Sequence, residues 1–333
     1  MQGNVGWQTK TALKDPSVPE RYRNPAEWPE PARDAWADDE GEAAAERHRE
    51  AVVEELRKAR VALDEFHPDL VVVWGDDQYE NFKEDVIPAF SVLAYEEFRA
   101  HPWQHRPGPN VWNEPADQVL SIKGHRDAGK YLTTRLLEEG FDVAYAYKPL
   151  HRDLGHAFLN SVLLLDWDRT GWSYPLLAFA VNCYGRKVVA QRATSVPLSL
   201  LPDEEELDPP SPPPWRCFDL GAATARIFAA SPWRVALLAS SSWSHAFLTP
   251  KTYLLFPDVE SDRRYFEAMK AGDYALWRQT TTEEIEDRGQ QEMLNWFCLV
   301  GAMAQLDRRP KYCAFVESWL CNSDKVFAAF PAC

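Results

Sequence analysis

Apolar residues with a helical period mark the longest helix that the sequence predicts. Between residues 46 and 66 they fall mostly on one face among dense charges, which is the 3.6-residue pattern of a surface helix. His67 and Pro68 end this helix. The 45 residues before it are rich in Pro, Trp and acidic groups, so we expect short helical turns broken by prolines there.

Continuous apolar runs predict buried strands that alternate with helices. The run LVVVWGDD at 70–77 stops abruptly in acidic residues, as a buried strand does when it leads into a loop. Further strands are expected at FDVAYAY, SVLLLDW, YPLLAFAVNCYG and WRVALLASSS, and further helices at 125–140, 219–230 and most of 262–306. This alternation predicts an α/β fold, which we expect to form one large domain over residues 1–333, with an exposed acidic and proline-rich excursion at 201–216.

Charge and composition argue against nucleic-acid-binding, membrane and disulfide-bonded secreted proteins. The chain has 51 Asp and Glu residues against 36 Lys and Arg residues, a formal net charge of −15, and such a surface repels phosphate backbones. Nucleic acid is therefore excluded as a partner. The longest apolar runs fall far short of the ~20 residues that cross a bilayer, which argues against a membrane protein. The six cysteines form no CxxC pair and follow no secretory signal, so we expect reduced thiols and a cytoplasmic location.

Three short segments place polar residues at the end of an apolar run. They are GDDQYENF at 75–82, LGHAF at 154–158 and SSSWSHAF at 240–247. In α/β proteins the ends of strands are where binding and catalytic residues gather. A lone histidine is more often a hydrogen-bonded structural residue than a functional one, so no single segment decides the function.

Taken together, the segments resemble parts of the class III, LigB-type extradiol dioxygenases. VVVWGDDQYENF resembles that family's strand and Gly-x-Asp-His-x-x-x-Phe loop, LASSSWSHAFL its strand and Ser-His loop, and RGQQEMLNWFCLVGAM the helix with its metal-binding glutamate. The order of the segments matches, and the resemblance covers residues 50 to 310. It implies a three-layer α/β/α fold with a central mixed sheet.

The resemblance implies an enzyme that opens a catechol-like aromatic ring with O2. Such enzymes use Fe2+ held by two His and one carboxylate, which leaves adjacent positions open for the catecholate and for dioxygen. Glu292 corresponds to the carboxylate ligand, His245 to an acid/base histidine, and His156 to a histidine that bonds the substrate hydroxyl. Each also has a structural interpretation: Glu292 as a surface charge, His245 at a strand end, and His156 bonded to a loop carbonyl.

The remaining expected site residues surround these three. The resemblance implies substrate contacts from Ser244, Asn81 and Tyr79. Asp77 is expected to add a carboxylate to the metal site, or alternatively to cap the segment that follows it. Gln78 stands where the family presents a ligating His, and an amide oxygen is a poorer ligand for iron than imidazole.

The family's other His ligand lies in a His-x-Pro segment near its N-terminus. The first histidine of this chain is His48, so either the chain begins downstream of that strand or this ligand has been lost. We expect the first of these. His48, His67, His101 and His105 lie in charged or proline-flanked surface contexts, and no function is expected of them.

Two other classes of protein compete with the dioxygenase. A catalytically inactive relative could use the same cleft to bind a ligand or partner, as Gln78 would permit. A hydrolase built on Ser244 is disfavoured, because adjacent residues of an extended segment point to opposite faces and Ser244 and His245 are then poorly placed as nucleophile and base. The abundant Trp also allows a homo-oligomer, and some members of the family pair with a small partner subunit.

Overall fold

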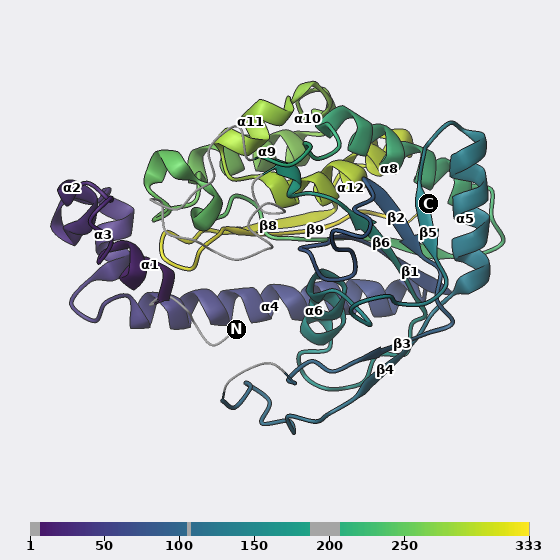
Figure 1. Ribbon diagram of the computed structural model, residues 1–333, viewed down its shortest axis with the longest axis horizontal. Coiled ribbons are helices and arrows are strands. Elements are labelled where there is room, and N and C mark those ends of the chain that lie inside the picture. The colour runs from purple at the N-terminus through teal and green to yellow at the C-terminus, as the bar shows by residue number, and fades with distance from the viewer. Residues whose placement is uncertain (1–6, 105–107, 187–206, 333) are drawn as a thin grey trace.

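The computed structural model describes residues 7–104, 108–186 and 207–332 (Figure 1). The N-terminal region forms short helices separated by prolines, as expected, and a long helix follows: α1 (Trp7–Ala12), α2 (Glu20–Arg23), α3 (Glu30–Trp36) and α4 (Glu42–Phe66). The later helices are α5 (Arg126–Glu138), α6 (His156–Leu165), α8 (Pro214–Ala229), α9 (Val259–Ala271), α10 (Tyr274–Gln279), α11 (Thr282–Asp287) and α12 (Leu294–Gln305). No helix in the described ranges is long and apolar enough to cross a membrane.

A five-stranded mixed sheet forms the middle of the fold. Its strands are β1 (Leu70–Asp76), β2 (Phe90–Leu93), β5 (Ala144–Ala146), β6 (Leu176–Val181) and β7 (Val235–Ser240), in the order β5-β2-β6-β1-β7. β1 runs parallel to both β6 and β7, and β2 runs antiparallel to β6 and parallel to β5. Two hairpins, β3 (Glu97–Ala100) with β4 (Leu120–Lys123) and β8 (Tyr312–Val316) with β9 (Lys325–Ala329), lie outside this sheet. The predicted α/β class and mixed sheet are confirmed.

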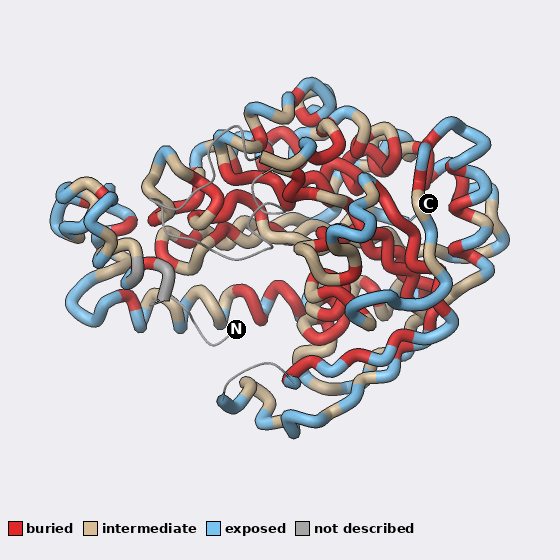
Figure 2. The backbone as a smooth tube through the Cα atoms, in the orientation of Figure 1, coloured by how far each residue is buried: buried red, intermediate tan, exposed pale blue. Residues whose placement is uncertain are grey.

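Helices cover both faces of the sheet. Side chains alternate across a strand, so Val72 and Trp74 of β1 join one hydrophobic core with α5, α8 and α12, while Val71 and Val73 join another with α4 and α6. Figure 1 shows α4 and α6 on one side of the sheet and α8 and α12 on the other. Burial is concentrated in the sheet and the elements packed on it (Figure 2). All seven residues of β1 are buried, which explains why its sequence is continuously apolar instead of alternating.

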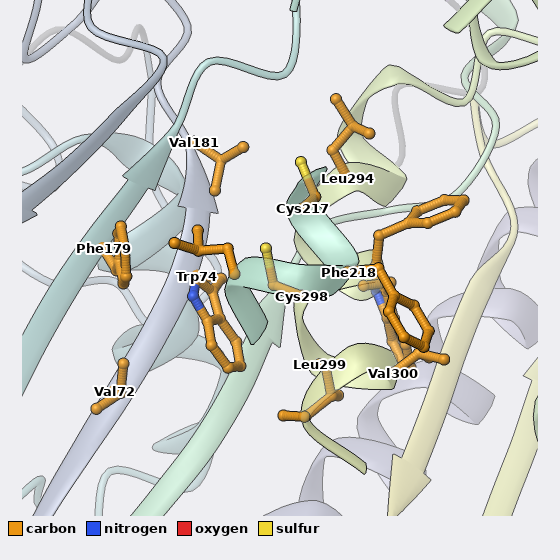
Figure 3. Close-up of a cluster of buried hydrophobic side chains, with 14 of the residues drawn as sticks. Val72, Trp74, Phe179, Val181, Cys217, Phe218, Leu294, Cys298, Leu299 and Val300 are labelled. Carbon is orange, nitrogen blue, oxygen red and sulfur yellow. The ribbon is translucent and has the colours of Figure 1, made fainter. Parts of the chain in front are cut away.

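Two glycines let α8 and α12 pack closely. A Cβ on Gly221 would lie 1.7 Å from the carbonyl oxygen of Cys298, and a Cβ on Gly301 would lie 2.0 Å from that of Phe218. Figure 3 shows Cys217, Phe218 and Cys298 between these two helices, with Trp74 of the sheet beside them. The contact fixes α12, which begins directly after Glu292 and Met293.

Several sequence-based predictions of elements were wrong. SVLLLDW is not a strand: most of it belongs to α6, whose apolar residues are buried against β1. A short apolar run gives no period that separates a buried helix from a buried strand. The expected excursion at 201–216 is described only from residue 207, and there Ser211 and Pro212 are buried and α8 begins at Pro214, so this part is not a fully exposed excursion.

Candidate active site at the carboxyl edge of the sheet

Three neighbouring strands end at the same edge of the sheet and bring the candidate residues together. In the strand register Asp76 of β1 is opposite Val181 of β6, and Gly75 is opposite Ser240 of β7. Ser240 then donates a hydrogen bond from its hydroxyl to the carbonyl oxygen of Ala157, in the first turn of α6, at 2.7 Å. The GDD, Ser-His and Gly-His segments are therefore neighbours in space.

His245 and Glu292 meet at this edge. Nε2 of His245 lies 3.3 Å from Oε1 of Glu292, and both side chains are 8% exposed. Nδ1 of His245 lies 2.9 Å from the carbonyl oxygen of Trp243 and donates to it, so the lone pair of a neutral ring is on Nε2, facing Glu292. Burial, together with the charge of Lys325, lowers the pKa of His245 to about 3, so the ring is neutral at pH 7.

Glu292 lies in a short 3-10 turn, η6 (Gln291–Met293), that leads into α12. Its carboxylate accepts hydrogen bonds from the hydroxyl of Tyr184, which follows β6, and from the backbone N–H of Ser242 at 3.3 Å. Burial raises the pKa of Glu292, although the hydrogen bond from Tyr184 opposes this shift. Glu292 is therefore a buried group at the sheet edge, and its interpretation as a surface charge was wrong.

His156 begins α6 and is held by carboxylates. Its Nδ1 donates to Oε2 of Glu80 at 2.8 Å, its backbone N–H donates to the same oxygen at 2.6 Å, and its Nε2 lies 3.9 Å from Oδ2 of Asp76. Burial alone would lower the pKa of His156, but the hydrogen bond to Glu80 and the charge of Asp76 raise it to about 9. His156 is therefore cationic at pH 7, and its side chain is 34% exposed.

Asp76 is a buried carboxylate near His156 and Glu292. It is 1% exposed, and its Oδ2 has no hydrogen-bond partner within the described residues. Burial and the nearby charge of Glu292 raise the pKa of Asp76 to about 7. A carboxylate in this setting favours a proton or a cation close by.

Asp77 and Asn81 fix the loop that follows β1. The carboxylate of Asp77 accepts from the backbone N–H groups of Asn81 at 2.8 Å and Phe82 at 2.9 Å. The amide of Asn81 donates to the carbonyl oxygen of Arg152 at 2.8 Å and accepts from the N–H of Gly155 at 2.8 Å. These contacts favour structural roles for both residues, in place of the metal and substrate contacts that the resemblance implies.

Ser244, Tyr79 and Gln78 lie in three different settings. Ser244 is fully buried and its hydroxyl donates to Asp262 at 2.6 Å, which argues against its pairing with His245 in a hydrolase. Tyr79 is half-buried and lines a narrow surface hollow, together with residues of its own loop region and with Ala180 and Asn182 at the end of β6. Gln78 is half-buried between Asp77 and Tyr79.

Tyr184 and Lys325 were not identified from the sequence, and Glu80 was considered only as a possible oxygen ligand near Gln78. Tyr184 binds Glu292, Glu80 binds His156, and Lys325 of the C-terminal hairpin lies near both His245 and Glu292. The ammonium of Lys325 donates to the carbonyl oxygen of Ser323 at 3.1 Å, and Ser323 forms an isolated β-bridge with His245. Glu80 belongs to the GDDQYENF segment that resembles the family. The local sequences around Tyr184 and Lys325 contain no motif that indicates the site.

The described residues supply only part of the ferrous ligand set that the resemblance implies. That set needs two imidazoles and one carboxylate, and Glu292 corresponds to the carboxylate. Gln78 offers an amide oxygen where the family has an imidazole. Across residues 7–104, 108–186 and 207–332, no group of three or more His, Cys, Asp or Glu side chains is arranged to hold a metal ion.

Comparison with known proteins points to one kind of enzyme. No protein-family model matches the chain. A protein of Photorhabdus laumondii named "2,3-dihydroxyphenylpropionate/2,3-dihydroxicinnamic acid 1,2-dioxygenase" is 22% identical over 77% of this chain and 71% of its own length. A protein of Pseudomonas putida with the same activity in its name is 30% identical over 40% of this chain and 36% of its own length. One of Azotobacter vinelandii is 25% identical over 57% of this chain and 48% of its own length. These matches support the extradiol dioxygenase family.

The positions of the three resembling segments in the structure agree with this similarity. Segments that resemble the family in sequence, around Gln78, His245 and Glu292, lie at one edge of the sheet in the structure. Identities of 22 to 30% support ring-cleaving dioxygenases as relatives. They do not identify the substrate or the metal of this chain.

Proposed function

We propose that the chain is a LigB-type dioxygenase that opens a catechol-like aromatic ring with O2, using Fe2+ as its cofactor. The observation that carries the proposal is the approach of His245 to Glu292, at 3.3 Å, from segments that are far apart in sequence and that each resemble the family. The relatives named for a dioxygenase reaction on 2,3-dihydroxyphenylpropionate support the same class of substrate.

The histidines are suited to proton transfer with a dihydroxylated ring. Neutral His245 presents the lone pair of Nε2 and can accept a hydrogen bond from a phenolic hydroxyl. Cationic His156 can donate a charge-assisted hydrogen bond to the oxygen of a catecholate. Together they would hydrogen-bond to the two oxygens of the diol and favour its anion.

The relatives' substrate also suggests a class of ring substituent. 2,3-Dihydroxyphenylpropionate carries an acidic side chain next to its hydroxyl groups, and we propose this compound and unsubstituted catechol as the first two probes. Arg152 and Lys83 lie on the loops that flank the site, where they could attract an anionic substrate.

A second function is favoured by two observations. Gln78 in place of an imidazole, and the missing three-ligand group in the described part of the chain, suit a relative that binds an aromatic ligand and does not react with oxygen. Such a protein would retain the hydrogen-bonding histidines and have weak affinity for Fe2+.

One pair of measurements separates the two functions. Binding of each diol is measured by calorimetry under nitrogen, and oxygen consumption is measured with an electrode after anaerobic addition of Fe2+. The dioxygenase predicts diol-dependent oxygen uptake that matches the amount of ring-opened product. Diol binding without oxygen uptake would establish the binding protein, and neither binding nor uptake would reject both functions.

A further inference from the structure

Asp262 is a fully buried carboxylate that the proposed chemistry does not use. It lies in α9 and is closed off from solvent. Its Oδ2 accepts hydrogen bonds from the backbone N–H of Ser244 at 3.0 Å and from the hydroxyl of Ser244 at 2.6 Å. Its Oδ1 accepts from Nε2 of Gln290 at 2.6 Å. One side chain therefore joins two loops that are distant in sequence.

These two loops are the ones that carry His245 and Glu292. Ser244 directly precedes His245, and Gln290 and Gln291 directly precede Glu292. The backbone N–H of His245 also donates to the carbonyl oxygen of Gly289 at 2.8 Å. The loops are thus joined twice, beside the point where Nε2 of His245 approaches Oε1 of Glu292.

A second buried acid contacts Asp262. Oδ1 of Asp324 accepts from the backbone N–H of Ser318 at 2.7 Å, while its buried Oδ2 faces no donor among the described residues. A proton on this Oδ2, donated to Asp262, satisfies both acids, and burial with the charge of Asp262 raises the pKa of Asp324 to about 9. Asp262 is then the anion of the pair, which makes it the stronger acceptor for Ser244 and Gln290.

We propose that Asp262 is a positioning residue, which holds His245 against Glu292 by binding Ser244 and Gln290. Where its effect on activity is concerned, this inference rests on the proposed function. Its effect on the geometry of His245 can be measured separately.

The test uses Asp262→Asn and a matched variant of the same helix. Asparagine keeps the size of the side chain but removes its charge and presents an NH2 group where an acceptor is needed. Tyr265→Phe removes a different buried hydrogen bond of α9, the 2.7 Å contact with Thr280. Misplacement of a reacting group by about 1 Å costs on the order of a hundredfold in rate. We expect this loss in kcat for oxygen uptake by Asp262→Asn, with KM little changed, and no such loss for Tyr265→Phe.

A double variant tests whether Asp262 acts through Ser244. Ser244→Ala removes one of the donors to Asp262 and should lower kcat in the same direction by a smaller factor. Asp262→Asn should then add less in the Ser244→Ala background than in the wild-type background. The inference would be overturned if the losses of kcat from Asp262→Asn and Ser244→Ala multiplied independently in the double variant. It would also be overturned if Asp262→Asn kept the wild-type kcat.

Histidine-selective NMR of the metal-free chain reads the geometry without any activity. The resonance of His245, assigned with His245→Gln, should move in Asp262→Asn and stay in place in Tyr265→Phe, and that of His156 should stay in place in both. A moved His245 signal in a chain that consumes no oxygen would support the positioning role and reject the proposed function. An unmoved His245 signal in Asp262→Asn would reject the positioning role. If Asp262→Asn does not fold, the His245 signal of Ser244→Ala is measured in its place.

Discussion

Burial and neighbouring charges shift the pKa values of the ionisable side chains at the sheet edge. Burial keeps His245 neutral, whereas Glu80 and Asp76 keep His156 cationic. Burial also raises the pKa values of Asp76 and Glu292, so these carboxylates gain from a cation or proton nearby. Of the two histidines, neutral His245 can accept a hydrogen bond from a diol and cationic His156 can stabilise an anion.

His245→Asn should identify the proton acceptor. Loss of a general acid/base group costs about 10²–10⁴-fold in rate, so we expect kcat for oxygen uptake to fall in that range while KM changes little. His101→Asn is the control, because His101 is an exposed residue paired with Asp153 at 3.7 Å. Equal losses of kcat in the two variants would contradict the assignment of His245.

Gln78→His should strengthen the metal site. An imidazole replaces an amide oxygen at the position where the resemblance implies a ligand, and we expect Fe2+ affinity to rise by about one order of magnitude or more. Anaerobic titration with a competing chelator measures the change. Lys83→His, on the same loop, controls for adding a histidine to this region. An unchanged affinity in Gln78→His, or an equal rise in both variants, would show that Gln78 does not face the metal.

At the scale of elements, long helices and continuously apolar strands could be predicted from the sequence, whereas the order of the strands in the sheet could not. The strands β1 and β7 and the helices α4, α5 and α12 follow from apolar runs and helical periods in the sequence. β2 and β8 were missed, because four or five residues of modest apolarity give no period to recognise. The order of the strands depends on contacts between distant segments, which local patterns do not specify.

The crossing of α8 and α12 should tolerate no side chain at Gly301. The Cβ of Gly301→Ala would lie 2.0 Å from the carbonyl oxygen of Phe218, so the helices must separate. Overpacking of this kind costs about 1–3 kcal/mol, and we expect the free energy of unfolding in urea to fall by at least that amount. Ala304→Ser, a half-buried site on the same helix, is the comparison. An unfolding free energy for Gly301→Ala equal to that of the wild type would contradict the close packing.

His48 should make the stability of the fold depend on pH. It lies in α4, and burial with the charge of Lys325 lowers its pKa to about 4, although a hydrogen bond with the backbone of Glu317 opposes the shift. His48 is half-buried and does not lie on the open surface that was expected. The unfolded chain takes up a proton near pH 6.5 and the folded chain does so only near pH 4, so stability is lost as the pH falls through this window.

His48→Gln should remove this loss. Between pH 7 and pH 5 we expect the wild type to lose about 1–2 kcal/mol more unfolding free energy than the variant, as measured by urea denaturation at both values. His67→Gln, at an exposed position just after α4, should behave as the wild type does. A parallel decline in His48→Gln and the wild type would show that His48 is solvated.

For the whole molecule, the candidate site depends on segments from most of the described chain. Asp76, His156, Tyr184, Glu292 and Lys325 reach one edge of the sheet from separate strands, helices and hairpins. The resemblance in sequence identified the segments around His156, His245 and Glu292, because each keeps a recognisable motif. It could not identify Tyr184, Lys325 or Asp262, since their roles arise from burial and partners that only the folded chain creates.

Labelled oxygen tests the central claim most directly. The Fe2+-loaded chain is incubated with 2,3-dihydroxyphenylpropionate under 18O2, and the product is weighed by mass spectrometry. A ring-cleaving dioxygenase built on His245 and Glu292 predicts a ring-opened product that carries both labelled atoms, and its loss in His245→Asn. Unchanged diol, or an oxidised product without label, would contradict the account.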